Sequence, residues 1–301
     1  MRHLFLLCLL VPVLAAGQQR KPDRKLQQAL EEIVGRFNGR AGIYVQHLKT
    51  GAWAAVNADT VFPTASIVKV PLLVGLFAKI DSGKLGYHQP MIYRDSAKYG
   101  GSGLMQFFKD SAATEVSVLA ALMMAYSDNT TSLWNQQLAG GGAEINRLLE
   151  QYGFKDTRVN SRTAGREEIR KIYGWGQTTP REMTTLLIRI RRGEIISRAA
   201  SERMYRLMSK GYYDEQALTQ IPPYVQAAAK TGSVNESRSE VVLVNAPHGD
   251  YAFYIGTKNI KDQRWEADNE AVEMIRTVSA LLWKHFEPRS DWKPTFRKET
   301  F

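Results

Sequence analysis

The chain has 301 residues, of which 44% are hydrophobic and 23% are charged, and its formal net charge is +10. This size suits one large domain or two small ones, and the composition is that of a folded globular protein. The positive charges are scattered, apart from Arg189, Arg191 and Arg192, so we expect a basic surface and no nucleic-acid site.

The first residues have the pattern of a cleaved export signal. Arg2 precedes the apolar run from Leu4 to Leu14, and the small residues Ala15-Ala16-Gly17 follow it. The run is shorter than the roughly 20 residues that a membrane-spanning helix needs. We expect a signal peptide over residues 1–17 and a secreted, periplasmic protein without stable membrane insertion; an uncleaved N-terminal anchor is the alternative.

Cysteine and histidine chemistry is sparse. The only cysteine, Cys8, lies within the expected signal, so the mature chain is predicted to have no disulfide. The five histidines are dispersed without the spacing of metal ligands, and no glycine-rich nucleotide fingerprint follows a strand. We therefore predict neither a metal nor a cofactor.

Hydrophobic periodicity predicts strands near both ends of the mature chain and helices between them. A helix over Asp23–Phe37 is followed by strands over Ala41–Leu48 and Ala52–Val56 and by a buried helix over Ser66–Ile80. Further helices are predicted over 115–126, 129–138, 143–151, 180–192 and 198–208, then strands over Val225–Ala229, Glu240–Asn245 and Tyr251–Thr257, and a last helix over about 265–286.

This order indicates one antiparallel sheet built from both ends of the chain, with an all-helical lobe inserted between them. We expect an α+β fold with a discontinuous α/β lobe (18–58 and 215–301) and an all-α lobe (59–214). A cleft between two such lobes is a common place for a catalytic site.

A possible nucleophile and base stand together in Ser66-Ile67-Val68-Lys69. Residues three apart share one helix face, so the Lys69 amine can reach the Ser66 hydroxyl and take its proton. A helix N-terminus also offers backbone N–H groups to a developing oxyanion. The pattern is weak alone and recurs at Ser290–Lys293, which we assign to a structural tail.

A second motif, Ser127-Asp128-Asn129, lies where one predicted helix ends and another begins. Helix capping is one interpretation, since all three residue types are common N-caps. In the functional interpretation, Ser127 passes a proton to the leaving group and Asn129 bonds a substrate amide.

A third motif, Lys230-Thr231-Gly232, follows an apolar strand. Lys230 can stabilise an anion, Thr231 can bond a substrate carboxylate, and Gly232 lets a backbone approach closely. The N–H of Ser233 would join that of Ser66 in an oxyanion hole. The same letters at Lys49–Gly51 fit a hairpin turn instead.

The three motifs in this order form the signature of class A serine β-lactamases and penicillin-binding proteins. Over about residues 25–287 the chain resembles the class A family. Supporting matches are Phe62-Pro63-Thr64-Ala65, Gly101-Ser102-Gly103-Leu104 and Thr178-Thr179-Pro180-Arg181-Glu182-Met183.

The resemblance implies acylation of Ser66 by a β-lactam or a D-alanyl peptide, with Lys69, Ser127 and Lys230 carrying protons and charge. It also implies an aromatic residue at the cleft rim, matched by Tyr99, and an arginine for the substrate carboxylate, for which Arg238 is the candidate. The alternatives are that Tyr99 is an ordinary surface aromatic residue and that Arg238 is a charge on a surface hairpin. We expect β-lactam hydrolysis by a monomer.

The chain departs from the family in the loop that normally carries the deacylating machinery. The family's Glu falls on Thr163 and its Asn on Glu167, and the family's Arg and Asp pair falls on Ser161 and Gly176. In a first interpretation Glu167 replaces the family's base, with a solvated pair of acids as the alternative. In a second, the acyl-enzyme persists, as in a penicillin-binding protein, a D,D-peptidase or a binding module. In a third, another hydrolytic specificity uses the same serine.

Overall fold

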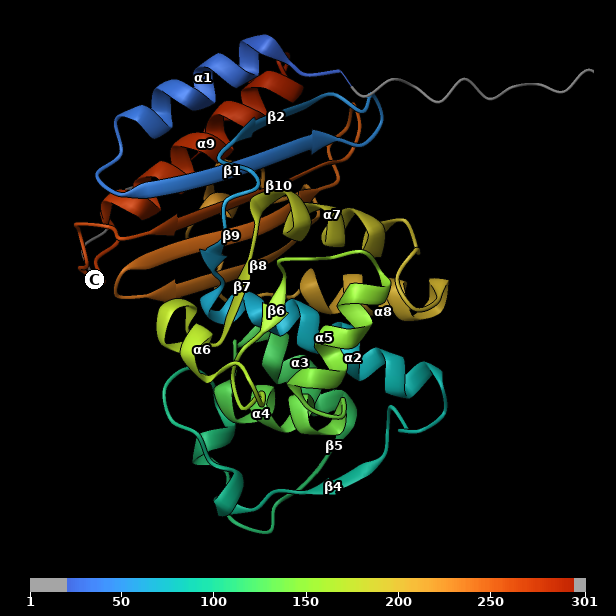
Figure 1. Ribbon diagram of the computed structural model, residues 1–301. Helices are drawn as coiled ribbons and strands as arrows, with labels where there is room; N and C mark the ends of the chain where they lie inside the picture. The colour runs from blue at the N-terminus through green and yellow to red at the C-terminus, as the bar shows by residue number, and fades with distance from the viewer. Residues whose placement is uncertain (1–20, 295–301) are drawn as a thin grey trace, which may run out of the picture.

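The computed structural model describes residues 21–294, so the expected signal over 1–17 lies outside the described residues. Its centre is a five-stranded antiparallel sheet in the order β2-β1-β10-β9-β8 (Figure 1). The strands are β1 (Arg40–His47), β2 (Trp53–Val56), β8 (Ala227–Val234), β9 (Ser237–Val244) and β10 (Tyr251–Lys258).

Helices cover both faces of this sheet. The terminal helices α1 (Arg24–Gly35) and α9 (Glu270–Phe286) lie on one face, and α7 (Pro180–Arg191) lies on the other (Figure 1). Alternate residues of a strand point to opposite faces, so Val242 packs on the α9 side of the sheet, while Val241 packs on the α7 side. The sheet is therefore buried on both sides.

The remaining helices form the second part of the molecule, below the sheet in Figure 1. At their centre lies α2, whose residues from Lys69 to Phe77 are all buried. The helices of this part are α2 (Lys69–Asp81), α3 (Val116–Ala125), α4 (Asn129–Leu138), α5 (Gly142–Gln151), α6 (Glu167–Tyr173) and α8 (Arg198–Met208).

Two small sheets and four 3-10 turns complete the described chain. The sheets pair in the orders β3-β7-β6 and β4-β5. Their strands are β3 (Phe62–Pro63), β4 (Pro90–Ile92), β5 (Ala113–Glu115), β6 (Arg158–Val159) and β7 (Gly176–Thr178), and the turns are η1 (Ala65–Val68), η2 (Asp95–Ala97), η3 (Met105–Phe107) and η4 (Ala217–Gln220).

The predicted α+β class, with one antiparallel sheet built from both chain ends, is confirmed. The lobe boundaries stay predictions. Periodicity missed α6 and the small sheets, because segments of two to seven residues carry too little pattern. No helix within residues 21–294 has the length and apolar character of a membrane span.

Candidate active site

Ser66 stands in the 3-10 turn η1, just before α2, so the expected α-helix begins three residues late, at Lys69. Ile67 and Val68 of this turn are fully buried and anchor it in the core. Ala65 has a positive φ of 44°, a backbone conformation that an L-residue adopts at some cost. The turn thus presents the Ser66 hydroxyl from a rigid, slightly strained support.

The Lys69 side chain is completely buried and ends among four oxygen atoms. Its Nζ lies 3.0 Å from each of Ser66 Oγ, Ser127 Oγ and Asn129 Oδ1, and 2.5 Å from the Ser127 carbonyl oxygen. The first two motifs of the sequence therefore meet at one nitrogen.

The chemistry of these four oxygens favours a neutral amine. The Ser127 carbonyl and the Asn129 amide oxygen only accept hydrogen bonds, whereas a serine hydroxyl can donate or accept. An amine with two N–H groups satisfies both acceptors and keeps a lone pair for the Ser66 hydroxyl. Burial, followed by the nearby Lys230 charge, holds the pKa of Lys69 well below its usual range.

Lys230 lies in β8 and is also buried, with its Nζ donating to the Thr231 carbonyl at 3.0 Å. Burial lowers the pKa of Lys230 to about 8, against a smaller opposing effect of Glu240. A lysine poised near neutral pH can hold an anion and still give up a proton.

In the second motif, capping and chemistry fall to different residues. Asp128 caps α4, accepting from the Thr131 N–H at 2.8 Å, and its other oxygen accepts from the Met105 N–H at 2.7 Å. Ser127, with a positive φ of 51°, and Asn129 turn toward Lys69 instead. The capping interpretation therefore holds for Asp128, and the functional roles of Ser127 and Asn129 stay predictions.

Gly232 is required by the close approach of the serine segment to β8. A methyl group on Gly232 would lie 2.4 Å from the Thr64 carbonyl oxygen, which is backbone and has little room to move. The absence of a side chain brings β8 against η1 and sets Ser233 near Ser66, where both line the same two cavities. The oxyanion hole at these two residues stays a prediction.

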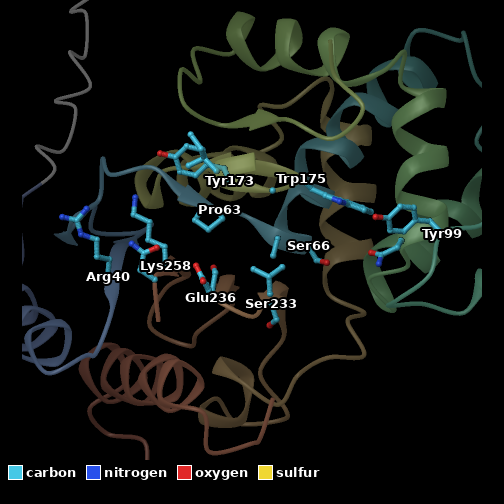
Figure 2. Close-up of a pocket in the computed structure, with 16 residues that line it drawn as sticks. Arg40, Pro63, Ser66, Tyr99, Tyr173, Trp175, Ser233, Glu236 and Lys258 are labelled. Atoms are coloured by element: carbon cyan, nitrogen blue, oxygen red, sulfur yellow. The ribbon is translucent and has the colours of Figure 1, made fainter. Parts of the chain in front are cut away.

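The two cavities meet at Ser66 and share Asn129 and Ser233. One, of about 540 Å³, runs beneath Trp175 and includes Tyr99 (Figure 2). The other, of about 480 Å³, lies on the side of Ser127 and Thr231.

Neither Thr163 nor Glu167 lines these cavities. Thr163 is buried and donates to the Ser161 carbonyl, and Glu167 is exposed at the start of α6, with its carboxylate accepting from Gly165 N–H. Both line a separate surface cavity. The structure thus gives the predicted replacement base Glu167 no access to the Ser66 cavities, because α6 turns its first residue outward.

At Ser66 the same loop instead presents Tyr173, Gly174 and Trp175. The Trp175 ring meets the Tyr99 ring edge to face, with centroids 5.2 Å apart. Tyr99 therefore lies along the cavity, and its role toward a substrate stays a prediction. Trp175 was missed by the sequence analysis, where only its aromatic character could have signalled a role.

Neutral and charge-assisted hydrogen bonds hold this loop where the family uses an internal Arg–Asp pair. Arg166 donates to Asn160 at 2.7 Å and to Gln177 at 2.8 Å. Glu182 of α7 accepts from the Thr157 N–H and hydroxyl, each at 2.7 Å. The missing ion pair is thus substituted by other contacts.

Arg238 is buried in the second cavity and is not a surface charge. Its guanidinium donates to the carbonyls of Val234, Ser237 and Arg264 and stacks 4.3 Å over the Trp265 ring. No carboxylate among residues 21–294 forms an ion pair with it. Arg276 of α9 lines the same cavity. It was not predicted, because it lies far along the chain from the motifs and no local pattern links it to them.

The two look-alike motifs lie elsewhere. Gly51 ends a hairpin turn with φ of 72°, and the Ser290 hydroxyl accepts from the Trp283 indole at 3.2 Å in the tail. Among residues 21–294, no group of three His, Cys, Asp or Glu side chains could hold a metal ion.

Known proteins resemble this chain over most of its length. The sequence profile described as "Beta-lactamase enzyme family" matches residues 25–286. The chain belongs to this family. The family profile thus covers the sheet, the helical part and all three motifs.

Relatives within the family include both lactamases and penicillin-binding proteins. Beta-lactamase VEB-1 of Pseudomonas aeruginosa is 21% identical over 273 residues, covering 85% of this chain and 89% of the relative. The solved structure of PBP-A is 28% identical, with a TM-score of 0.79 over 89% of this chain and 98% of that one. An ancestral class A β-lactamase, 21% identical with a TM-score of 0.76 over 87% of this chain and 100% of its own, shares the fold.

Proposed function

We propose that this serine hydrolase of the β-lactamase family is acylated at Ser66 by β-lactams and releases the acyl group slowly. It would then act as a penicillin-binding protein or D,D-peptidase. The observation that carries the proposal is the pairing of a complete acylation set around Lys69 with a loop that offers no carboxylate to the Ser66 cavities.

In the acylation step, Lys69 takes the Ser66 proton while Ser66 Oγ bonds to the β-lactam carbonyl carbon. The ring C–N bond breaks, and the ring nitrogen receives a proton through the Ser127 hydroxyl, which shares Lys69 with Ser66. The proton gained by Lys69 is thereby returned, so the step balances without a cofactor.

Deacylation needs a water activated by a base, and the loop side chains that line the Ser66 cavity are those of Ile172, Tyr173 and Trp175, none of which is a carboxylate. PBP-A supports the acylation half of the proposal by analogy, since a mutant of that protein has been solved as an acyl-enzyme complex with penicillin G. For this chain we propose a persistent adduct.

Catalytic β-lactam hydrolysis is the second candidate, because the relatives include several proteins named β-lactamases. Export to the periplasm, proposed from residues 1–17, suits either activity. N-terminal sequencing of the protein from the periplasm of an expressing cell would test it; a start at Gln18 is expected.

A chromogenic cephalosporin separates the two candidates. The protein is mixed with excess reagent while colour and intact mass are followed together. One equivalent of colour with a stable mass increase supports the proposal. Continuous colour release would make the protein a lactamase, and the absence of both adduct and colour would remove acylation altogether.

A further inference from the structure

The cavity beneath Trp175 continues past Ser66 to a charged end that the acylation chemistry does not use. Figure 2 shows Arg40 and Lys258 together at the end opposite Tyr99, with Glu236 between them and Ser233. All three charged residues line the same cavity as Ser66.

The two cations are neighbours by strand pairing. Arg40 of β1 is directly opposite Lys258 of β10, so their side chains leave the same face of the sheet. Lys258 Nζ donates to the Val61 carbonyl at 2.7 Å and lies 5.1 Å from the Phe62 ring centroid. Among residues 21–294, one of its three N–H donors is thus taken by a protein carbonyl.

These three charged side chains are not bound in ion pairs within the described part of the chain. Among residues 21–294, neither Arg40, Lys258 nor Glu236 forms a salt bridge. Burial and the repulsion of Arg40 lower the pKa of Lys258. Two cations against one carboxylate leave this end of the cavity with an excess positive charge.

The sheet register gives the span from Gly232, next to the cavity residue Ser233, to Lys258. Gly232 is opposite Ser239, which is opposite Gly256, and Lys258 is two residues further along β10. Two strand spacings and two residue rises separate the Gly232 and Lys258 α-carbons by about 12 Å. The lysine side chain spans part of this gap, so an arm about two residues long, roughly 7 Å, bridges the rest.

Resting on the proposed function, we infer that this end of the cavity is a subsite for an acyl donor whose arm ends in a carboxylate. The carboxylate lies between Arg40 and Lys258. The middle of the arm passes the apolar side chains of Pro63 and Tyr173, which line the cavity on the way. The carboxylate of Glu236 repels further negative charge, so we expect the arm to carry a single carboxylate.

Two penicillins with the same nucleus test this subsite. One carries an adipyl arm, ending in a carboxylate, and the other an adipamoyl arm of equal length, ending in a neutral amide. The second-order rate constant of adduct formation is measured for each by intact mass. The wild-type protein is expected to prefer the carboxylate arm by about tenfold, since charge-assisted bonds are the stronger ones.

The double variant Arg40→Gln/Lys258→Gln is expected to bring this preference to about one, with each single variant in between. Glu236→Gln is expected to raise the preference for the carboxylate arm above that of the wild-type protein. Lys84→Gln, an exposed lysine that lines none of the cavities described above, is the matched control and keeps the wild-type ratio.

The neutral arm separates failure of this inference from failure of the proposed function. Equal rates for the two arms on the wild-type protein, or an unchanged ratio in the double variant, would overturn the subsite. If the neutral arm forms no adduct on the wild-type protein, the acylation proposal fails instead.

Discussion

The Nζ atom of Lys69 is equidistant, at 3.0 Å, from the hydroxyl oxygens of Ser66 and Ser127. One buried amine thus joins the two hydroxyls that we propose as the nucleophile and as the proton donor to the leaving nitrogen. Because the protonated amine lacks solvent, it is driven to pass its proton on. This relationship underlies the first prediction.

Acylation is expected to need both Ser66 and Lys69, but to different degrees. Ser66→Ala is expected to give no penicillin adduct by intact mass, because no oxygen is left to attack. Lys69→Ala is expected to slow adduct formation by at least about 100-fold, the usual contribution of a general base. Ser290→Ala is the control, since that hydroxyl only accepts from Trp283. An adduct on the Ser66→Ala protein would place the nucleophile elsewhere.

Acylation by an anionic penicillin is expected to decline above about pH 8, where Lys230 loses its charge. Burial lowers the pKa of Lys230, so the ammonium is present below this pH and lost as the pH rises through it. If binding needs the charge, the rate falls by about tenfold between pH 7 and pH 9. Stopped-flow mixing with a chromogenic cephalosporin measures the profile.

Two variants identify the group responsible for that decline. Lys230→Arg keeps its charge at all these pH values and is expected to remove the alkaline limb. Burial also raises the pKa of Glu240 to about 8, so Glu240→Gln tests the competing titration. A limb that disappears in Glu240→Gln and remains in Lys230→Arg would reassign the effect to Glu240.

Glu167→Gln is expected to leave the lifetime of the acyl adduct within about twofold of the parent, since an exposed carboxylate outside the cavity cannot activate its water. The lifetime is measured by intact mass after removal of free penicillin. The neighbouring exposed Glu168→Gln is the control. A selective, tenfold longer lifetime for Glu167→Gln would restore this residue as the base.

Gly232→Ala is expected to destabilise the protein by about 2 kcal/mol or more through overpacking, and to slow acylation. Its methyl group would meet the Thr64 carbonyl, forcing β8 away from the serine turn. Gly35→Ala is matched, since a methyl group there meets nothing within 4 Å. Urea unfolding gives the stability. Equal stability of the two variants would contradict the close approach.

Glu182→Gln is expected to cost about 2 kcal/mol, because a charged acceptor of several hydrogen bonds is replaced by a weaker one. Its carboxylate accepts from the N–H groups of Lys155 and Thr157, where the loop leaves the helical part. Exposed Glu32→Gln serves as the control. Urea unfolding tests the loss of stability, and a change below about 0.5 kcal/mol would show that the loop is held otherwise.

Much of this protein follows from its sequence. Periodic segments predicted the sheet from both ends and the helices between, because burial of an apolar face imposes a period of two on roughly 4 to 8 residues of a strand and of 3.6 on roughly 10 or more residues of a helix. The order of the three motifs indicated the family. The sequence of the loop also showed that Thr163 stands where the family has its usual acid.

Contacts between distant residues needed the tertiary structure. Asp128 and Ser127 are adjacent in sequence, yet one caps a helix and the other faces Lys69, since a positive φ turns the chain between two helices. Arg238 was assigned by position alone, and only packing beneath Trp265 shows that it is buried.

The sequence by itself therefore determined the fold class, the family and the residue types available for acylation, all of which depend on local pattern and order. The tertiary structure decided which of those residues meet: it buried Lys69 between two serines, turned Glu167 outward and joined Arg40 to the serine cavity. Such outcomes depend on strand register and on the direction in which a short helix starts, which no local pattern encodes.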